Sequence, residues 1–494
     1  MQPPEQNVSR NILTKSIHGG AWLTAGFIVQ KTIGFISFVI LGRLLLPSDF
    51  GILVLMLLVP KFLESASDAG LSKALIQDQG NVERYLNPLW TFGILKSAAV
   101  AVIVFFGGPL IASYLHAEHA ILAIRLGGLF MLIQSFSNIG EIFFFKELDF
   151  KKVFVRNVCK DLAYTIVGIM VVFATRSYWA LVAATTASYF TQAISTYILH
   201  PYRPRFTFRF APLWRFFGYS KWIVGQNWSQ RIYGFLESTI LARTLDVNNL
   251  GLFSKAKSLA GVAPGLLGPM FNLVSFPTYA KLQEEPTKIR DGFIKSLNLL
   301  FFILVPVIFL VIVAGGKLIL IILGPSWLPM TNALRILLLF FSLSISTDIT
   351  QAILNALGRP KTQTSLSFIS LLVTIALLVP FTMLWGITGS AIAILVGLLP
   401  ILILSYKLLA SLTALTLRDV GTSLALPLVV STILFLPTII WKEALLALPT
   451  PALLGFAGSI GILYGGVILF IGLRFNYGPY PILRLIWNTL KPRA

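Results

Sequence analysis

The stretch GFIVQKTIGF, Gly26–Phe35, is apolar on both sides of a polar pair, Gln30 and Lys31. The pattern returns in Gln226–Phe235, QNWSQRIYGF, where Arg231 takes the place of the lysine. A cation in the middle of an apolar helix is costly, and such residues usually face a protein interior or water. The sequence therefore raises the question of what the two cations do.

The two stretches belong to a longer internal repeat. An offset of 200 pairs Gln30 with Gln230 and gives nine identities in the 32 positions from Trp22 to Leu53. Chance matching in so apolar a chain gives roughly two or three. The repeat covers one helix and the turn that follows it.

Composition places the chain in a membrane. Of its 494 residues 56% are hydrophobic and only 12% are charged, against about 25% charged in soluble domains. The net charge of +20 fits basic cytoplasmic loops that face anionic lipid headgroups, so we expect membrane lipid rather than nucleic acid as a partner. One cysteine, Cys159, and four scattered histidines give no metal-ligand spacing, so we expect no metal and no cofactor.

Apolar runs of about 20 residues predict an all-α polytopic membrane protein with about fourteen transmembrane helices. The connecting segments are short and leave no room for a soluble domain. The predicted spans are 17–46, 50–78, 87–115, 118–146, 151–175, 177–200, 214–245, 249–282, 288–314, 327–357, 361–384, 386–410, 416–441 and 449–474.

Lysine and arginine are distributed unequally between the two sets of loops, which predicts the orientation. One set, together with the C-terminal tail, is rich in cations, whereas the opposite set holds little more than Arg43, Arg176, Arg243 and Lys442. Both termini are then cytoplasmic, which requires an even number of spans. The basic set comprises Arg10, Lys15, Lys146, Lys151, Lys152, Arg156, Arg203, Arg205, Arg209, Arg215, Lys281, Lys288, Arg290, Arg359, Lys361, Arg418, Arg484, Lys491 and Arg493.

The repeat also predicts the domain organisation. Its copies fall in spans 1 and 7, and six intervening spans leave them parallel. This predicts two six-helix lobes related by a pseudo-two-fold axis along the membrane normal, with a cavity between them and two extra C-terminal helices. The predicted parts are a cytoplasmic N-terminus (1–16), an N-lobe (17–200), a basic cytoplasmic linker (201–213), a C-lobe (214–410), spans 13 and 14 (411–474) and a cytoplasmic tail (475–494).

Seven short motifs, spread over nearly the whole chain, resemble those of the oligosaccharide flippases. These proteins belong to the multidrug, oligosaccharidyl-lipid and polysaccharide exporter superfamily, and the similarity is greatest to its colanic-acid and lipopolysaccharide repeat-unit exporters. One departure is DVNN, Asp246–Asn249, which lacks the proline of its counterpart LPSD. The motifs are LPSDFG (Leu46–Gly51), SDAGLSKALIQ (Ser67–Gln77), FKELDFKK (Phe145–Lys152), LGLFSKA (Leu250–Ala256), SFPTYAKLQ (Ser275–Gln283), LGPSWLPMTNALRILLLF (Leu323–Phe340) and AILNALGRP (Ala352–Pro360).

The resemblance implies a function. Members of this family move an undecaprenyl-diphosphate-linked oligosaccharide from the cytoplasmic to the periplasmic leaflet of the bacterial inner membrane, for lipopolysaccharide or exopolysaccharide synthesis. Glycosyltransferases build the substrate, and a polysaccharide polymerase or ligase uses it outside. The family also implies alternating access and coupling to a cation gradient.

A diphosphate on this path needs fixed cations in a wet cavity. Lys31 lies about 14 residues into its span, roughly 21 Å at 1.5 Å per residue, which is near the membrane midplane. We expect Lys31 and Arg231 to face one central cavity and to bind the diphosphate in turn, with Gln30 and Gln230 as hydrogen-bond donors. The alternative is that each cation pairs with a nearby acid, such as Glu64 or Glu237, and only holds helices together.

Other charges lie within predicted spans. Lys61, Glu64 and Asp68 are at positions i, i+3 and i+7, on one helical face. Glu64 and Asp68, together with Lys61, are candidates for proton or sodium coupling, whereas the alternative is a Lys61–Glu64 ion pair. For Arg335 and Asp348 we expect structural pairing or a place in a cavity lining.

Two other functions are less consistent with the sequence. A multidrug or cation antiporter of the same fold would use acids to attract cationic drugs, which Lys31 would repel. A membrane glycan polymerase or ligase would need a catalytic cluster on a large outer loop, but the outer loops are short. We therefore expect a transporter and not an enzyme.

Overall fold

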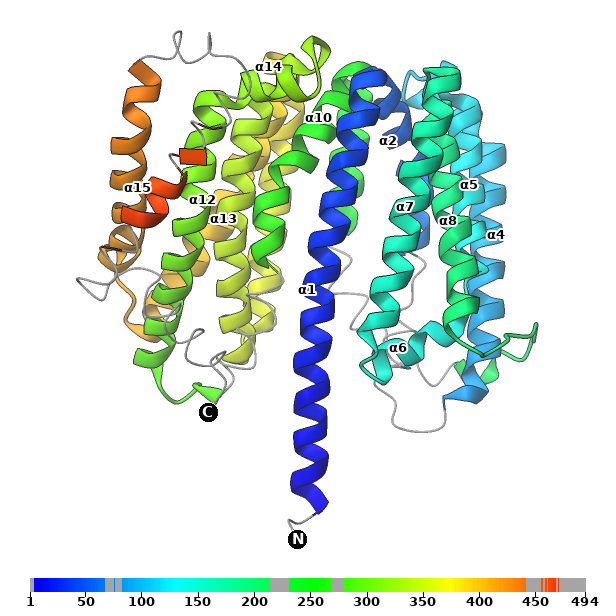
Figure 1. Ribbon diagram of the computed structural model, residues 1–494, viewed down its shortest axis with the longest axis horizontal. Coiled ribbons are helices and arrows are strands. Elements are labelled where there is room, and N and C mark those ends of the chain that lie inside the picture. The colour runs from blue at the N-terminus through cyan, green and yellow to red at the C-terminus, as the bar shows by residue number, and fades with distance from the viewer. Residues whose placement is uncertain are drawn as a thin grey trace. The chain divides into compact units, whose positions relative to one another are not determined.

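In the residues that the computed structural model describes, all regular elements are helices (Figure 1). The described residues are 4–66, 75, 82–213, 231–268, 279, 281–440 and a few positions between 455 and 470. Gln230, Asp68 and most of predicted span 14 lie outside them.

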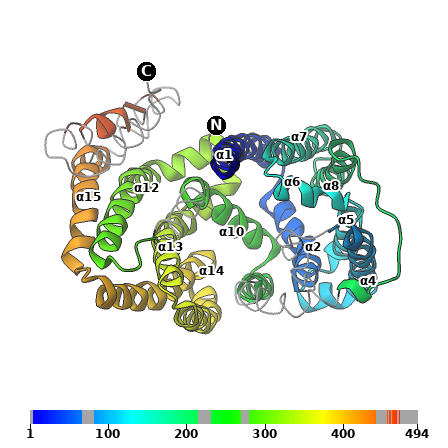
Figure 2. The same cartoon turned by 90° about the horizontal axis from the view of Figure 1, so that it is seen from below.

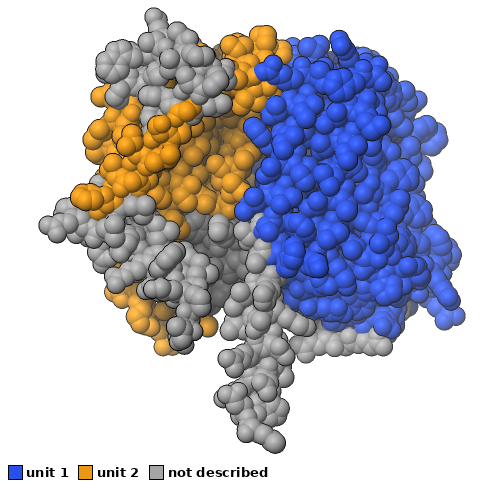
Figure 3. All heavy atoms as spheres, viewed as in Figure 1, with its two compact units in different colours: residues 1–254 blue, residues 255–494 orange. Residues whose placement is uncertain are grey.

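The chain divides into two compact units, Met1–Ser254 and Lys255–Ala494 (Figure 3). Residues 231–254, which the sequence prediction assigned to the C-lobe, are thus grouped with the N-terminal half. Residues 214–230, with which the predicted C-lobe begins, are outside the described chain. The predicted domain scheme therefore stays a prediction.

Unit 1 is built from long helices that pack side by side. Seen from below, α7 lies between α1 and α8, and α5 packs against both α4 and α2 (Figure 2). The turn between α7 and α8 begins at Arg176, whose φ of 45° gives the left-handed cap common at helix ends. The elements are α1 (Pro4–Leu44), α2 (Pro47–Ala66), α4 (Glu83–Tyr114), η1 (Glu118–Ala120), α5 (Ile121–Ser135), η2 (Ile139–Glu141), α6 (Ile142–Lys146), α7 (Phe150–Thr175), α8 (Trp179–Leu199), η3 (Ala211–Leu213), a helical stretch at 231–244, and the first part of α10 (Val247–Ala260).

In unit 2 the longest element, α14 (Pro360–Thr413), is a helical hairpin. Its backbone leaves helical geometry at Trp385 and Gly386. Ser370 donates a hydrogen bond to the carbonyl of Gly397 across the hairpin, which requires two antiparallel halves. The break falls where the sequence predicts the boundary between spans 361–384 and 386–410. The other elements are α12 (Pro286–Ile322), η4 (Pro325–Met330), α13 (Thr331–Ala356) and α15 (Leu417–Ile440).

Within the described residues, seven helices are long and apolar enough to cross a membrane. A bent pair, Glu118–Ser135 with Ile139–Lys146, would make an eighth span with a 67° break. The hairpin of α14 counts once in this total, although 52 residues at 1.5 Å each would reach about 78 Å, more than twice the hydrocarbon core. The polytopic all-α fold is confirmed, and the total of fourteen spans stays a prediction.

Candidate functional site

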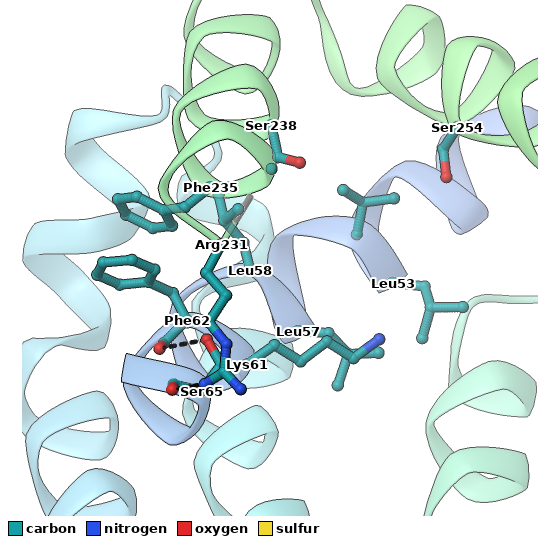
Figure 4. A pocket seen from close by; sticks show the side chains of 12 residues that line it. Leu53, Leu57, Leu58, Lys61, Phe62, Ser65, Arg231, Phe235, Ser238 and Ser254 are labelled. Atoms are coloured by element: carbon teal, nitrogen blue, oxygen red, sulfur yellow. Dashed lines mark hydrogen bonds between the residues drawn. The ribbon is translucent and has the colours of Figure 1, made fainter. Parts of the chain in front are cut away.

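Helix α2 lines a cavity of about 480 Å³ in unit 1, here called the α2 cavity. Arg231 enters it from the helical stretch 231–244 and donates a hydrogen bond from Nη1 to the carbonyl oxygen of Ser65 (Figure 4). Beside it the rings of Phe62 and Phe235 are stacked, with centroids 3.9 Å apart. The ring contact thus packs α2 against the stretch 231–244, and Arg231 of that stretch forms part of the cavity lining.

A second cavity of about 590 Å³, here called the polar cavity, shares Lys61, Ser65 and Arg231 with the first. The two cavities therefore adjoin at two cations. The polar cavity is bounded by α2, α4, α5, α8 and the segment 137–141. Its lining also includes Lys96, Glu64, Glu141, Gln134, Gln192, Trp90 and Tyr189.

Both acids of the polar cavity are in ion pairs. Glu64 Oε1 lies 3.0 Å from Lys96 Nζ, and Ser97 Oγ donates to Glu64 Oε2 at 3.2 Å. Glu141 Oε2 lies 2.5 Å from Nη1 of Arg156, a residue outside the lining. Three lining cations thus face two paired carboxylates, which leaves the cavity suited to an anionic group with hydroxyls or amides around it.

Asn138 fixes one wall of the polar cavity. Its side chain is fully buried. Its Nδ2 donates to the carbonyl of Tyr202 at 2.6 Å, and its Oδ1 accepts from the backbone N–H of Gly140 at 2.9 Å. Its own N–H donates to Thr196 Oγ1 at 2.8 Å. A buried polar group with all these partners holds the wall in one conformation.

Of the residues predicted to bind the diphosphate, only some line the two cavities described above. Arg231 lines both cavities, whereas neither lining contains Lys31 or Gln30. The Lys31 side chain is exposed, with its Nζ 5.1 Å from the centroid of the Phe27 ring on the same helix. Gln230 lies outside the described residues. The prediction that Lys31 and Arg231 share one cavity stays a prediction.

The predicted coupling residues Lys61 and Glu64 both line the polar cavity. Glu64 pairs with Lys96 of α4, and the alternative of a Lys61–Glu64 ion pair stays a prediction. The sequence analysis did not select Lys96, although a lone lysine in the apolar stretch GILKSAAV was a sufficient signal. Asp68 lies outside the described residues.

In unit 2, Arg335 of α13 is hydrogen-bonded to the neighbouring helix α12. Its Nη2 donates to the carbonyl oxygen of Ile312 at 2.7 Å, and its Nη1 donates to Asn332 Oδ1 at 3.1 Å. Asp348 is exposed on α13. Among the residues that the structure describes, no group of three or more His, Cys, Asp or Glu side chains is placed to hold a metal ion.

Comparison with known sequences agrees with a role in polysaccharide synthesis. A family model described as "Polysaccharide biosynthesis protein" matches residues 40–332, more than half of the chain. The lipopolysaccharide biosynthesis protein WzxC of Escherichia coli is 23% identical, over 87% of this chain and 87% of its own. The teichuronic acid biosynthesis protein TuaB of Bacillus subtilis is 21% identical, over 70% and 72%, and the succinoglycan biosynthesis transport protein ExoT of Rhizobium meliloti is 23% identical, over 59% of each chain.

Comparison with solved structures agrees with the transporter fold. The lipid II flippase MurJ in an inward closed conformation superposes with a TM-score of 0.68 at 13% identity, covering 90% of this chain and 98% of that one. An inward-facing multidrug resistance MATE transporter gives 0.60 at 15% identity, covering 78% and 95%. ExoT is named a transport protein and both solved structures are of transporters, in agreement with the expected transporter fold. This multi-pass membrane protein belongs to the polysaccharide biosynthesis protein family that matches residues 40–332.

Proposed function

We propose that this protein moves a lipid-linked oligosaccharide from the cytoplasmic to the periplasmic leaflet during polysaccharide assembly. Family membership and the named relatives support a polysaccharide substrate. The fold is similar to that of a lipid II flippase, a protein that handles a lipid-linked saccharide. The remaining support comes from the chemistry of the polar cavity.

The observation that carries the proposal is a cavity with three cations, Lys61, Lys96 and Arg231, inside a unit of apolar helices. Sugar hydroxyls cannot cross about 30 Å of hydrocarbon without losing their water, so the head group needs a hydrated, polar path. A diphosphate on that path needs fixed positive charge. Arginine can bind two phosphate oxygens at once, whereas each lysine supplies a compact point charge.

The finer features of the proposal extend the sequence predictions. Arg231 is the arginine of the first binding position, and Lys31, with Gln30 and Gln230, is a candidate for a second position reached by alternating access. Glu64 and Asp68 are the candidates for ion coupling. We further propose that the protein lies in a bacterial inner membrane with both termini cytoplasmic. It would act after the glycosyltransferases that build the substrate and before a polymerase or ligase.

A reconstituted assay tests the proposal. Purified protein in vesicles would receive a labelled undecaprenyl-diphosphate oligosaccharide in one leaflet, and a membrane-impermeant glycosidase would report its arrival in the other. We expect wild-type protein to expose the label and Arg231→Gln to be strongly impaired. Lys288→Gln is the matched control, because Lys288 is an exposed cation paired with Glu285 in the other unit.

Other outcomes would support the rival functions. Uptake of a cationic dye with no movement of the oligosaccharide would favour a multidrug antiporter. Lengthening of the glycan would favour a polymerase or ligase.

A further inference from the structure

We propose that Glu64 is a resident counter-anion of the binding site, which the substrate's diphosphate displaces from Lys96. This inference rests on the proposed function. It makes Glu64 a competitor of the diphosphate and not a residue that binds it. It starts from the ion pair between Glu64 Oε1 and Lys96 Nζ at 3.0 Å.

The surroundings show why this ion pair suits exchange. The Lys96 side chain is 17% exposed and that of Glu64 is 34% exposed, so both border the open volume of the cavity. Without a nearby anion, the Lys96 ammonium group would carry its charge with little access to water. Loss of the Glu64 carboxylate with no anion to replace it would therefore be costly. Ser97 Oγ, which donates to Glu64 Oε2 at 3.2 Å, holds the carboxylate in place.

The carboxylate also occupies the position that a diphosphate needs. Lys61 and Arg231 line the same cavity, so an entering diphosphate would meet two cations and compete with Glu64 for the third. Phosphate oxygens and a carboxylate accept the same charge-assisted hydrogen bonds from an ammonium group. One anion therefore replaces another at Lys96.

The direction in which one mutation changes diphosphate affinity distinguishes this role from direct substrate binding. In Glu64→Gln the competitor loses its charge but keeps its size. We expect the full-length protein in detergent to bind geranyl diphosphate about two- to fivefold more tightly, the range that a partly exposed ion pair can supply. Lys96→Gln should weaken binding, and Glu64→Asp, which retains the competing charge, should give no comparable gain.

Glu141→Gln is the matched control for net charge. It removes a carboxylate from the same lining, but one that Arg156 already holds at 2.5 Å. Its gain in affinity should be clearly smaller than that of Glu64→Gln. Equal gains in the two variants would show that only net charge matters and would overturn the proposal.

The remaining outcomes are also decisive. Weaker or unchanged binding by Glu64→Gln, beside normal wild-type binding, would overturn the counter-anion role and leave the proposed function intact. If neither wild type nor Glu64→Gln binds geranyl diphosphate, both the exchange and the diphosphate site are wrong.

Discussion

Gly51 and Gly251 each pack against the backbone at the start of the other's helix. A Cβ on Gly51 would overlap the carbonyl oxygen of Val247, and a Cβ on Gly251 would overlap that of Pro47. The repeat offset of 200 pairs Gly51 with Gly251 and Pro47 with Val247. The contact is therefore reciprocal, as a local two-fold relation between the repeat copies requires, and only glycine permits so close an approach of backbones.

Substitution of either glycine should separate the two helix starts. We expect Gly51→Ala or Gly251→Ala to destabilise unit 1 by about 1–3 kcal/mol or more, the usual cost of overpacking. The melting temperature of the purified protein in detergent measures the effect. Gly34→Ala is the control, because nothing lies within 4 Å of its Cβ position and alanine favours a helix by about 1 kcal/mol over glycine. Equal melting temperatures for all three variants would contradict the close approach.

Residues 201–210, here called the strap, have no regular secondary structure and are hydrogen-bonded to two side chains of α4. Asn87 Oδ1 accepts from the N–H of Arg205 at 2.8 Å and from the hydroxyl of Tyr202 at 2.9 Å. One helical turn later, Thr91 Oγ1 accepts from the N–H of Thr207 at 3.0 Å. The strap thus connects the end of α8 to α4 through three hydrogen bonds.

Removal of these acceptors should release the strap. Each hydrogen bond contributes about 1 kcal/mol. The double variant Asn87→Ala with Thr91→Val should therefore raise the population of detached strap about tenfold or more. Trypsin would report this as faster cleavage after Arg205 and Arg209 in detergent-solubilised protein. Thr175→Val is the control, since that hydroxyl donates only to the carbonyl of Val171 on its own helix. A cleavage rate equal to that of wild type would show that the strap is held by other contacts.

The sequence predicted the helices well because length and hydrophobicity alone decide a membrane span. The predicted span 151–175 differs from α7, Phe150–Thr175, by a single residue. Which side chains meet in a cavity depends instead on how helices rotate and pack, and this is not encoded locally. The ion pair of Glu64 with Lys96 joins residues 32 positions apart, so no helical spacing could have indicated it. The absence of Lys31 from the linings of these two cavities could not be predicted for the same reason.

Arg290 and Asp419 connect α12 to α15 in unit 2 through a two-pronged ion pair. Nη2 lies 2.7 Å from Oδ1 and Nε lies 3.1 Å from Oδ2. Asp419 Oδ2 also accepts from the N–H of Thr416 at 2.8 Å, so the carboxylate is fixed before the arginine binds it. Paired geometry of this kind is stronger than a single contact between flexible side chains.

A double-mutant cycle should detect this coupling. Arg290→Met and Asp419→Asn should each lower the melting temperature, and the double variant should lose less than the sum of the two. Arg290→Lys should retain only part of the stability that Arg290→Met loses, because lysine cannot form both hydrogen bonds to Asp419. The control is Lys288→Met on the same helix, where the pair with Glu285 has side chains 62% and 47% exposed and should contribute little. Strictly additive effects would mean that the two residues act independently.

His200 should make the stability of unit 1 depend on pH. It follows the end of α8, and its ring stacks on Phe143 with centroids 5.2 Å apart. Its Nδ1 accepts a hydrogen bond from the N–H of Tyr202 at 3.1 Å, which requires that nitrogen to be deprotonated. Burial, and then the nearby positive charge of Lys152, lower the pKa of His200 below its usual 6.5, against a smaller opposite effect of Glu147.

The direction of the pH effect follows from that shift. When a histidine pKa is lower in the folded protein, the unfolded chain binds the proton more readily as pH falls below about 6.5. Stability should therefore be complete above pH 6.5 and should decrease from there towards the lower pKa of the folded state. His200→Asn keeps an acceptor near the Nδ1 position but does not titrate, so its melting temperature should fall less between pH 7.5 and 5.5 than that of wild type. His116→Asn, at a position with φ of 52° that asparagine tolerates, should retain the wild-type slope. If His200→Asn loses as much stability as wild type over this interval, another group is responsible for the acid sensitivity.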